Sequence, residues 1–209
     1  MSDTPRDPNT SQQTPLERLE ALLKATRGEK LPPVHKWDPP ARPDIGLAIS
    51  YDGSWSYQGD RIERGELVRL FSTVLRREED GGFFLVTPVE KVPVSVDETP
   101  FVVVEMQIRG SGADQDILLR TSVDDVIAVS PVHPIRFVPE PPDGGLKPIV
   151  HVRDRLEARV NRAVYYDLVE ACAVTPHEGE DHFGLWSSGT FFAMARAADI
   201  PGLLEDEDT

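Results

Sequence analysis

Cysteine is almost missing from this chain, which has Cys172 as the only one among 209 residues. No disulfide can form within the chain, and a zinc site built from cysteines is excluded. Long apolar runs are missing as well, because no stretch approaches the roughly 18 apolar residues that suggest a membrane span. The N-terminal residues are polar and lack the apolar core of a signal peptide. The sequence therefore predicts a cytoplasmic protein that does not associate with membranes.

Basic residues are also scarce, since the chain has 22 lysines and arginines but 36 aspartates and glutamates, which gives a formal net charge of −14. Most of such a surface repels the phosphate backbone of nucleic acids and the headgroups of anionic lipids. Nucleic acid and membranes are therefore excluded as general partners. The charge leaves a small-molecule ligand and a protein as possible partners.

The chain is predicted to have four segments. Residues 1–30 form a disordered tail followed by a helix, in which Thr14 and Glu17 complete a capping box. A first repeat domain covers 31–138, and the linker PEPPDGG of residues 139–145 separates it from a second repeat domain at 146–202. An acidic tail covers 203–209.

An internal duplication supports the two repeats. A hairpin, an arginine, an amphipathic helix and two strands occur in this order around Arg64 and again around Arg162. In this alignment Arg64 matches Arg162 and Leu67 matches Tyr165, and beyond the helices Thr87 matches Ser187. The first helix is predicted from about Arg64 to Arg77, and Asn161 caps the second. The predicted fold is α+β, with duplicated antiparallel β-sheet units that each carry one helix. Pro93 lacks a backbone donor, which predicts an edge strand or a bulge.

Several side chains are candidates for binding an anionic ligand. Arg64 and Arg162 stand near helix starts, where the helix dipole favours anions, although each has acidic neighbours with which it can pair. The segment 87–91 brings a hydroxyl, a carboxylate and an ammonium close together, which suits either a ligand or a salt-bridged turn. Arg153 belongs to a local cluster of arginines, and Trp55 and Tyr57 either stack on a base or belong to the core.

Motifs that would indicate an enzyme or a metal site are not found. The acidic loop between His177 and His182 matches no zinc spacing. The segment from Gly184 to Gly189 fails the G-x-S-x-G spacing and leads into a strand. No catalytic residue, metal or cofactor is therefore predicted.

Several motifs resemble, in order, an uncharacterised bacterial family, the domain-of-unknown-function family twelve eighty-five. They are Asp52-Gly53-x-Trp55-x-Tyr57-x-Gly59, Arg64-x-x-Leu67-Val68-x-Leu70-Phe71, the run from Leu85 to Lys91, and Val152-Arg153-x-x-Leu156-Glu157-Ala158 with Arg162-x-x-Tyr165-Tyr166. The resemblance implies a duplicated α+β architecture with a C-terminal half loosely like a pleckstrin-homology fold. It also implies a small-molecule site at the domain interface, for a nucleotide-like ligand, and a role in signalling.

The leading hypothesis is a ligand-binding or sensor protein without enzymatic activity, in which an anionic, nucleotide-like molecule lies between the two repeats. The predicted ligand-binding residues are Trp55, Tyr57, Arg64, Thr87, Glu90, Lys91, Arg153 and Arg162. Two alternatives stay open: a protein-interaction module, and a hydrolase or transferase in which His133 or His151 reaches Ser187 or Thr87.

Overall fold

The computed structural model describes residues 14–26, 31–140 and 145–200. By its internal contacts the chain divides into two compact units, one made of residues 1–49 and 54–95 and the other of residues 50–53 and 96–209. The predicted repeat boundaries at 138 and 146 do not coincide with this division. The predicted tails at 1–13 and 203–209 lie outside the described residues.

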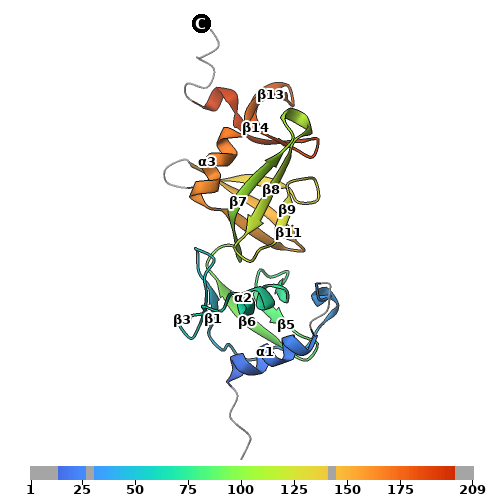
Figure 1. Cartoon of the computed structure of the whole chain (residues 1–209), viewed down its shortest axis with the longest axis vertical. Coiled ribbons are helices and arrows are strands. Elements are labelled where there is room, and N and C mark those ends of the chain that lie inside the picture. The colour runs from blue at the N-terminus through green and yellow to red at the C-terminus, as the bar shows by residue number, and fades with distance from the viewer. Residues whose placement is uncertain (1–13, 27–30, 141–144, 201–209) are drawn as a thin grey trace, which may run out of the picture. The chain divides into compact units, whose positions relative to one another are not determined.

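The first unit contains a six-stranded sheet in the order β3-β2-β1-β6-β5-β4, with helices nearby (Figure 1). Its elements are α1 (Pro15–Thr26), η1 (Val34–Lys36), β1 (Leu47–Ile49), β2 (Trp55–Tyr57), β3 (Asp60–Arg61), α2 (Gly65–Ser72), β4 (Leu75–Arg77), β5 (Phe83–Val86) and β6 (Lys91–Val96). Its core is apolar, with Ile49, Phe71 and Leu85 completely buried. Burial of each such side chain contributes about 1.5–3 kcal/mol.

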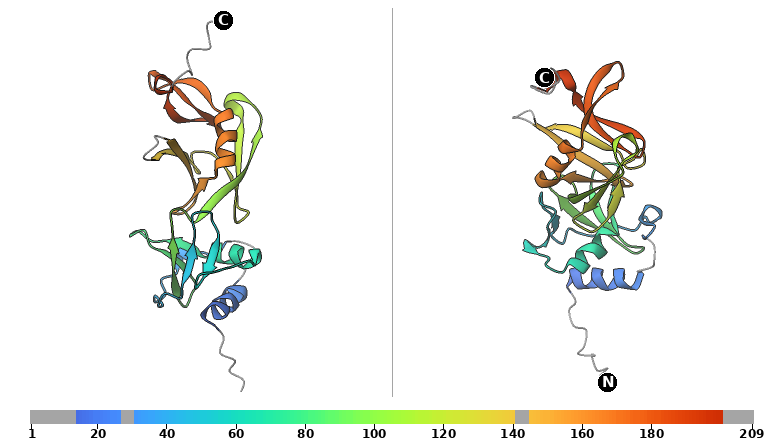
Figure 2. Two further views of the ribbon diagram at one scale, coloured as in Figure 1. Left: turned by 90° about the vertical axis from the view of Figure 1, so that its left-hand side faces the viewer. Right: turned by 45° about the horizontal axis from the view of Figure 1, so that its top comes forward.

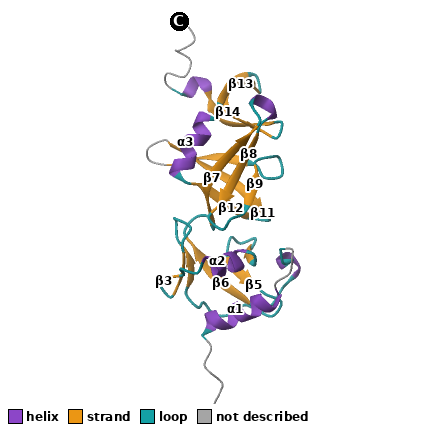
Figure 3. Cartoon of the chain, in the orientation of Figure 1, coloured by secondary structure: helices purple, strands orange, loops and turns teal. Residues whose placement is uncertain are grey.

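The second unit contains a six-stranded sheet and a separate three-stranded sheet (Figure 3). The larger sheet has the order β10-β11-β12-β7-β8-β9, and the smaller has the order β13-β14-β15. Their elements are β7 (Phe101–Arg109), η2 (Gly112–Asp114), β8 (Asp116–Thr121), β9 (Val126–Ala128), β10 (Ile135–Glu140), β11 (Gly145–Arg153), β12 (Leu156–Val160), α3 (Arg162–Glu170), β13 (Ala173–His177), β14 (Glu180–Ser187), β15 (Thr190–Arg196) and η3 (Ala197–Asp199). Among the described residues of this unit, the strand pairs are antiparallel except β12 with β7.

The predicted α+β fold with duplicated units is confirmed. In both units a β-hairpin leads into a helix, and a three-stranded antiparallel arrangement follows the helix: β4-β5-β6 after α2, and β13-β14-β15 after α3. Thr87 and Ser187, which the sequence aligns, are both completely buried. The likeness of the C-terminal half to a pleckstrin-homology fold stays a prediction.

The helix alignment within the duplication needs a correction of one residue. Arg64 is the N-cap of α2, whereas the N-cap of α3 is Asn161 and Arg162 is its first helical residue. The buried residues agree with the caps, because Leu67 of α2 corresponds to Val164 of α3 rather than to the predicted Tyr165. Arg64 and Arg162 therefore do not occupy equivalent positions.

Two further local predictions differ from the structure. Helix α2 ends at Ser72 rather than at the predicted Arg77, because the chain turns at Thr73 and continues as β4. The sequence predicts Pro93 on an edge strand or at a bulge, but it lies on β6, which is interior in its sheet and pairs with β5 in regular register. The neighbouring β1 has only three residues, so it cannot pair with the whole of the six-residue β6. A proline without an N–H is then tolerated in this strand.

Two predicted helix caps are confirmed. The Thr14 hydroxyl accepts from the Glu17 amide at 3.2 Å, and the Glu17 carboxylate accepts from the Thr14 amide at 2.9 Å. The side chain of Asn161 accepts from the Val164 amide at 2.8 Å. No helix in the described part of the chain is long and apolar enough to span a membrane.

Candidate functional site

A pocket of about 330 Å³ lies in the first unit, between α1 and the start of α2. The two helices are neighbours in the fold (Figures 1 and 2). We call it the Arg64 pocket, and it is lined by Glu20, Lys24, Arg64, Gly65, Glu66, Leu67 and Leu70. A concave site with an apolar wall and a few charged groups is the usual form of a small-molecule site.

The local sequence explains how these side chains reach the pocket. Arg64 has extended backbone at the N-cap of α2, and its side chain makes no capping bond, so the guanidinium is available to the pocket. Glu20 and Lys24 are one turn apart on α1 and therefore lie on the same face of this helix. Leu67 is buried on the α2 face that packs into the core, and it supplies part of the apolar wall.

Glu20 is the most strongly bound charged group of the Arg64 pocket. Arg64 donates to it through both terminal nitrogens, from Nη1 to Oε1 at 3.2 Å and from Nη2 to Oε2 at 2.7 Å. The Lys24 ammonium lies 2.7 Å from Oε1. These two cations, Lys24 first, hold the pKa of Glu20 below its ordinary value despite its burial. The pocket thus binds a carboxylate in the forked geometry that arginine uses for carboxylates and phosphates.

Of the eight predicted ligand-binding residues, Arg64 is the one that lines this pocket. Trp55 is only 1% exposed, and its ring packs against Phe71 with 6.0 Å between ring centroids. Tyr57 is half-buried, and its hydroxyl accepts from the side-chain Nε2 of Gln58 at 3.1 Å. In this conformation Trp55 contributes to the core, which leaves no face of its ring open for a ligand to stack on.

The structure brings the predicted group of Thr87, Glu90 and Lys91 together at one turn. The Thr87 hydroxyl donates to the Glu90 carbonyl at 3.0 Å and accepts from the Glu90 amide at 3.1 Å. The Glu90 carboxylate is almost completely buried and forms ion pairs with Arg18 and Arg42, each at 2.8 Å. Lys91 lies 3.3 Å from Glu78. All three residues thus have partners within the first unit.

The other predicted residues lie in the second unit. Arg153 pairs with Asp125 at 2.5 Å, and its guanidinium lies over the Phe101 ring at 5.1 Å from the centroid. Arg162 donates to the Tyr166 hydroxyl at 3.2 Å on the exposed surface of α3. The shared ligand site that the sequence analysis predicts for Arg64 and Arg162 stays a prediction.

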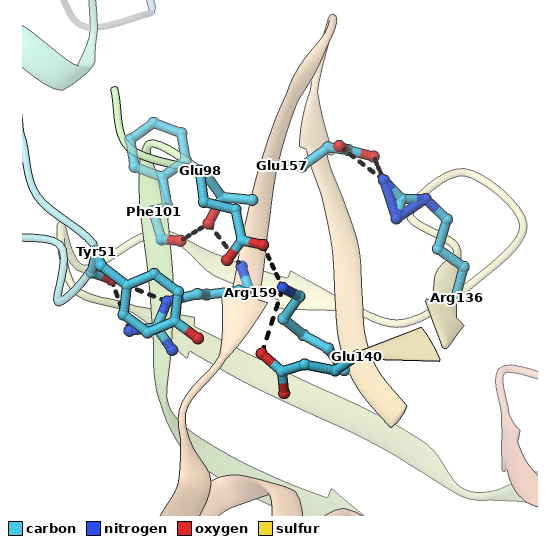
Figure 4. Close-up of polar contacts among 9 residues, drawn as sticks. Tyr51, Glu98, Phe101, Arg136, Glu140, Glu157 and Arg159 are labelled. Atoms are coloured by element: carbon cyan, nitrogen blue, oxygen red, sulfur yellow. Dashed lines mark hydrogen bonds and ion pairs between the residues drawn. The ribbon is translucent and has the colours of Figure 1, made fainter. Parts of the chain in front are cut away.

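A second polar cluster is centred on Arg159 of β12, which belongs to the predicted arginine cluster around Arg153 but is not among the eight predicted ligand-binding residues (Figure 4). Arg159 is 8% exposed and donates to the Tyr51 carbonyl through two nitrogens, at 2.8 and 2.6 Å. Its guanidinium lies 3.8 Å from the centroid of the Tyr51 ring. Beside it, the Glu98 carboxylate binds Lys147 and raises the pKa of that ammonium. Arg159 thus holds the segment 50–53 in place, and it has no open side toward solvent.

Ser187 and His151, two of the residues that the hydrolase alternative would need, bond to the backbone instead of to each other. Ser187 donates to the Val129 carbonyl at 2.7 Å. The ring nitrogens of His151 lie 3.2 Å and 2.7 Å from the carbonyls of Val132 and Asp154, whereas the buried Nδ1 of His133 has no hydrogen-bond partner in the described part of the chain. Ser187 and His151 therefore form no pair of nucleophile and base. Within the described ranges, no group of three or more potential metal-binding side chains comes together.

Cys172 is expected to be unreactive in the folded protein. Burial raises the pKa of its thiol to about 12, so almost no thiolate is present at neutral pH. We expect Ellman's reagent at pH 8 to leave the native thiol unmodified and to react with it fully after unfolding in guanidinium chloride. Complete modification of the native protein within minutes would contradict this expectation.

Comparison with known proteins identifies the family of both units. A family model described as "Domain of unknown function (DUF1285), N-terminal domain" matches residues 32–99, and one described as "Protein of unknown function (DUF1285), C-terminal domain" matches residues 100–194. This is the family that the sequence motifs resemble. No curated protein matches the chain significantly.

Two solved structures are similar to the chain. The first, a DUF1285 family protein from Silicibacter pomeroyi DSS-3, is 41% identical, with a TM-score of 0.78 over 87% of this chain and 96% of that one. The second, a DUF1285 family protein from Shewanella baltica OS155, is 25% identical and covers 59% of this chain and 90% of that one, with a TM-score of 0.45.

Proposed function

The chain belongs to the DUF1285 family, whose description assigns no activity, and we propose that it binds a small anionic ligand in the Arg64 pocket. The observation that carries the proposal is the forked contact between Arg64 and a carboxylate at this position. The Arg64 side chain is 62% exposed, so a ligand from solvent can reach it.

The size of the pocket supports a ligand no larger than a mononucleotide. A volume of about 330 Å³ lies near the lower end of the roughly 300–1,000 Å³ of typical ligand pockets. Leu67 and Leu70 give the pocket an apolar wall against which a base or a hydrocarbon chain can pack. This composition suits the nucleotide-like ligand that the family resemblance implies.

The charges of the pocket favour a ligand with one anionic group over a polyphosphate. Arg64 and Lys24 bring two positive charges, but Glu20 and Glu66 bring two negative ones. Each further phosphate would come close to a carboxylate, and like charges repel at short range. We therefore expect a nucleoside monophosphate or another phosphate monoester to bind more tightly than the corresponding triphosphate.

Arg64→Gln is expected to weaken this binding by at least roughly tenfold, because a hydrogen bond to a charged group contributes about 1.5–3 kcal/mol. The measurement is a titration of AMP, inorganic phosphate and ATP by calorimetry, together with thermal unfolding. A ligand at about 100 times its Kd should stabilise the wild type by roughly 2.7 kcal/mol.

Arg61→Gln is the matched control. Arg61 is 64% exposed, is close to Arg64 in sequence, and lies 3.7 Å from Glu63, but it does not line the pocket. It should leave the affinity unchanged. Equal losses in both variants would point to general charge attraction, and the absence of binding to all three probes would refute the proposed function.

A further inference from the structure

Helix α1 is held on the first unit by contacts of two kinds, apolar burial and ion pairs. Leu19 and Leu23 are each 1% exposed and provide the apolar contact. Arg18 of the helix reaches the buried Glu90 carboxylate, and Glu20 of the helix reaches Arg64. The helix is therefore docked mainly by burial, and each of its two long-range ion pairs adds specificity to its position.

Helix α1 also lies outside the part of the chain that the family models match, since the N-terminal model begins at residue 32. The pocket residues at the start of α2 belong to the matched part, whereas Glu20 and Lys24 do not. The family domain thus supplies Arg64, and the additional segment α1 supplies Glu20, the carboxylate that Arg64 binds.

The contact between Glu20 and Arg64 has the form of a ligand contact. Both oxygens of the carboxylate accept from the two terminal nitrogens of one guanidinium, and its side chain is 11% exposed. An external carboxylate or phosphate would need the same two nitrogens. The two anions cannot occupy this fork together, because their negative charges would be in direct contact.

We propose that α1 is a competitive cap on the ligand site: Glu20 occupies the anion position at Arg64, and a ligand phosphate or carboxylate binds by taking Arg64 from it. This inference rests on the proposed function of the same pocket. Exchange of the two anions removes one of the contacts that dock α1. Coupling between two binding events is reciprocal. If the docking of α1 lowers the affinity for the ligand by some factor, the bound ligand must therefore lower the equilibrium constant for docking of α1 by the same factor.

Glu20→Gln tests the competition directly. The amide keeps the shape of the side chain but removes the negative charge, so Arg64 becomes available to an external anion. We expect the affinity for AMP to rise about 5-fold or more, the lower end of usual coupling factors. Glu17→Gln is the matched control, because it removes the same charge from the same helix and retains a capping box. It should leave the affinity at the wild-type value.

Leu23→Ala provides a second, uncharged test of the cap. It weakens the docking of α1 without touching the residues that line the pocket, so it should also raise the affinity for AMP. In the wild type, saturating AMP should accelerate hydrogen exchange in residues 15–26, and it should not accelerate exchange in β5 or β6.

The outcomes separate this inference from the function on which it rests. If the wild type and Glu20→Gln bind AMP equally well, the cap is refuted and the ligand site stands. If Glu20→Gln binds more weakly, Glu20 contacts the ligand rather than competing with it, and the cap is again refuted. If neither protein binds AMP or inorganic phosphate, both proposals fail.

Discussion

Gly184→Ala is expected to destabilise the second unit by about 3 kcal/mol, because a methyl group has no room at this position. A Cβ built on Gly184 would lie 2.4 Å from the carbonyl oxygen of Phe192 and 2.9 Å from the Cα of Ala193. Both are backbone atoms of the paired strand β15, which cannot rotate away as a side chain can. Accommodating the methyl group requires the β14–β15 ladder to open, and overpacking of this kind typically costs about 1–3 kcal/mol or more.

Gly189→Ala, at the turn of the same hairpin, is the control for this prediction. Gly189 has a φ of +68°, but nothing lies within 4 Å of a Cβ added there. Its substitution should cost only the backbone strain of a left-handed residue, roughly 1–2 kcal/mol. Urea unfolding of both variants, followed by Trp fluorescence and circular dichroism, measures the difference. Equal losses would show that the crowding at Gly184 relaxes without opening the sheet.

Ser187→Ala is expected to cost about 2–4 kcal/mol, because it removes a hydroxyl that bonds to two buried backbone groups. Its Oγ accepts from the Ile117 amide at 2.9 Å and donates to the Val129 carbonyl at 2.7 Å. The residue is completely buried, so both groups would lose their partner where water has little access. Each unsatisfied group costs about 1–3 kcal/mol.

The neighbouring Ser188→Ala provides the control. The Ser188 hydroxyl is exposed and donates to the Asp116 carboxylate at 2.8 Å, so water can replace it and the loss should stay below about 1 kcal/mol. The same unfolding measurement compares the two variants. If Ser187→Ala is as stable as Ser188→Ala, a water molecule has taken over the two bonds, and a crystal structure of the variant would show it.

The parts of the fold that depend on neighbouring residues could be predicted from the sequence. The capping box of Thr14 and Glu17 and the cap of Asn161 need only partners three residues away. By contrast, the end of α2 was missed, because Val74 and Leu75 continue the helical spacing of apolar residues although the chain has already left the helix there.

The candidate site could be predicted only in part, for the same reason. The position of Arg64 at a helix start marked it as a candidate for binding an anion. Its partner Glu20 is 44 residues away, and no periodicity or spacing connects the two. Arg159 shows the same limit, since the Tyr51 carbonyl that it binds is 108 residues distant. The predicted helix alignment also matched Arg64 with Arg162, whereas the N-cap of α3 is Asn161, one residue earlier.

The parallel pairing of β12 with β7 constrains the order in which the second unit forms during synthesis. β8, the antiparallel neighbour of β7, leaves the ribosome soon after β7. The other edge of β7 stays unpaired until residues 156–160, which form β12, have been made. Translation proceeds at about 5–20 residues per second, so this open edge persists for seconds. During that time the unpaired backbone groups at this edge of β7 are a template for pairing with another chain, and residues that the folded unit buries, such as Phe101 and Val103, stay exposed.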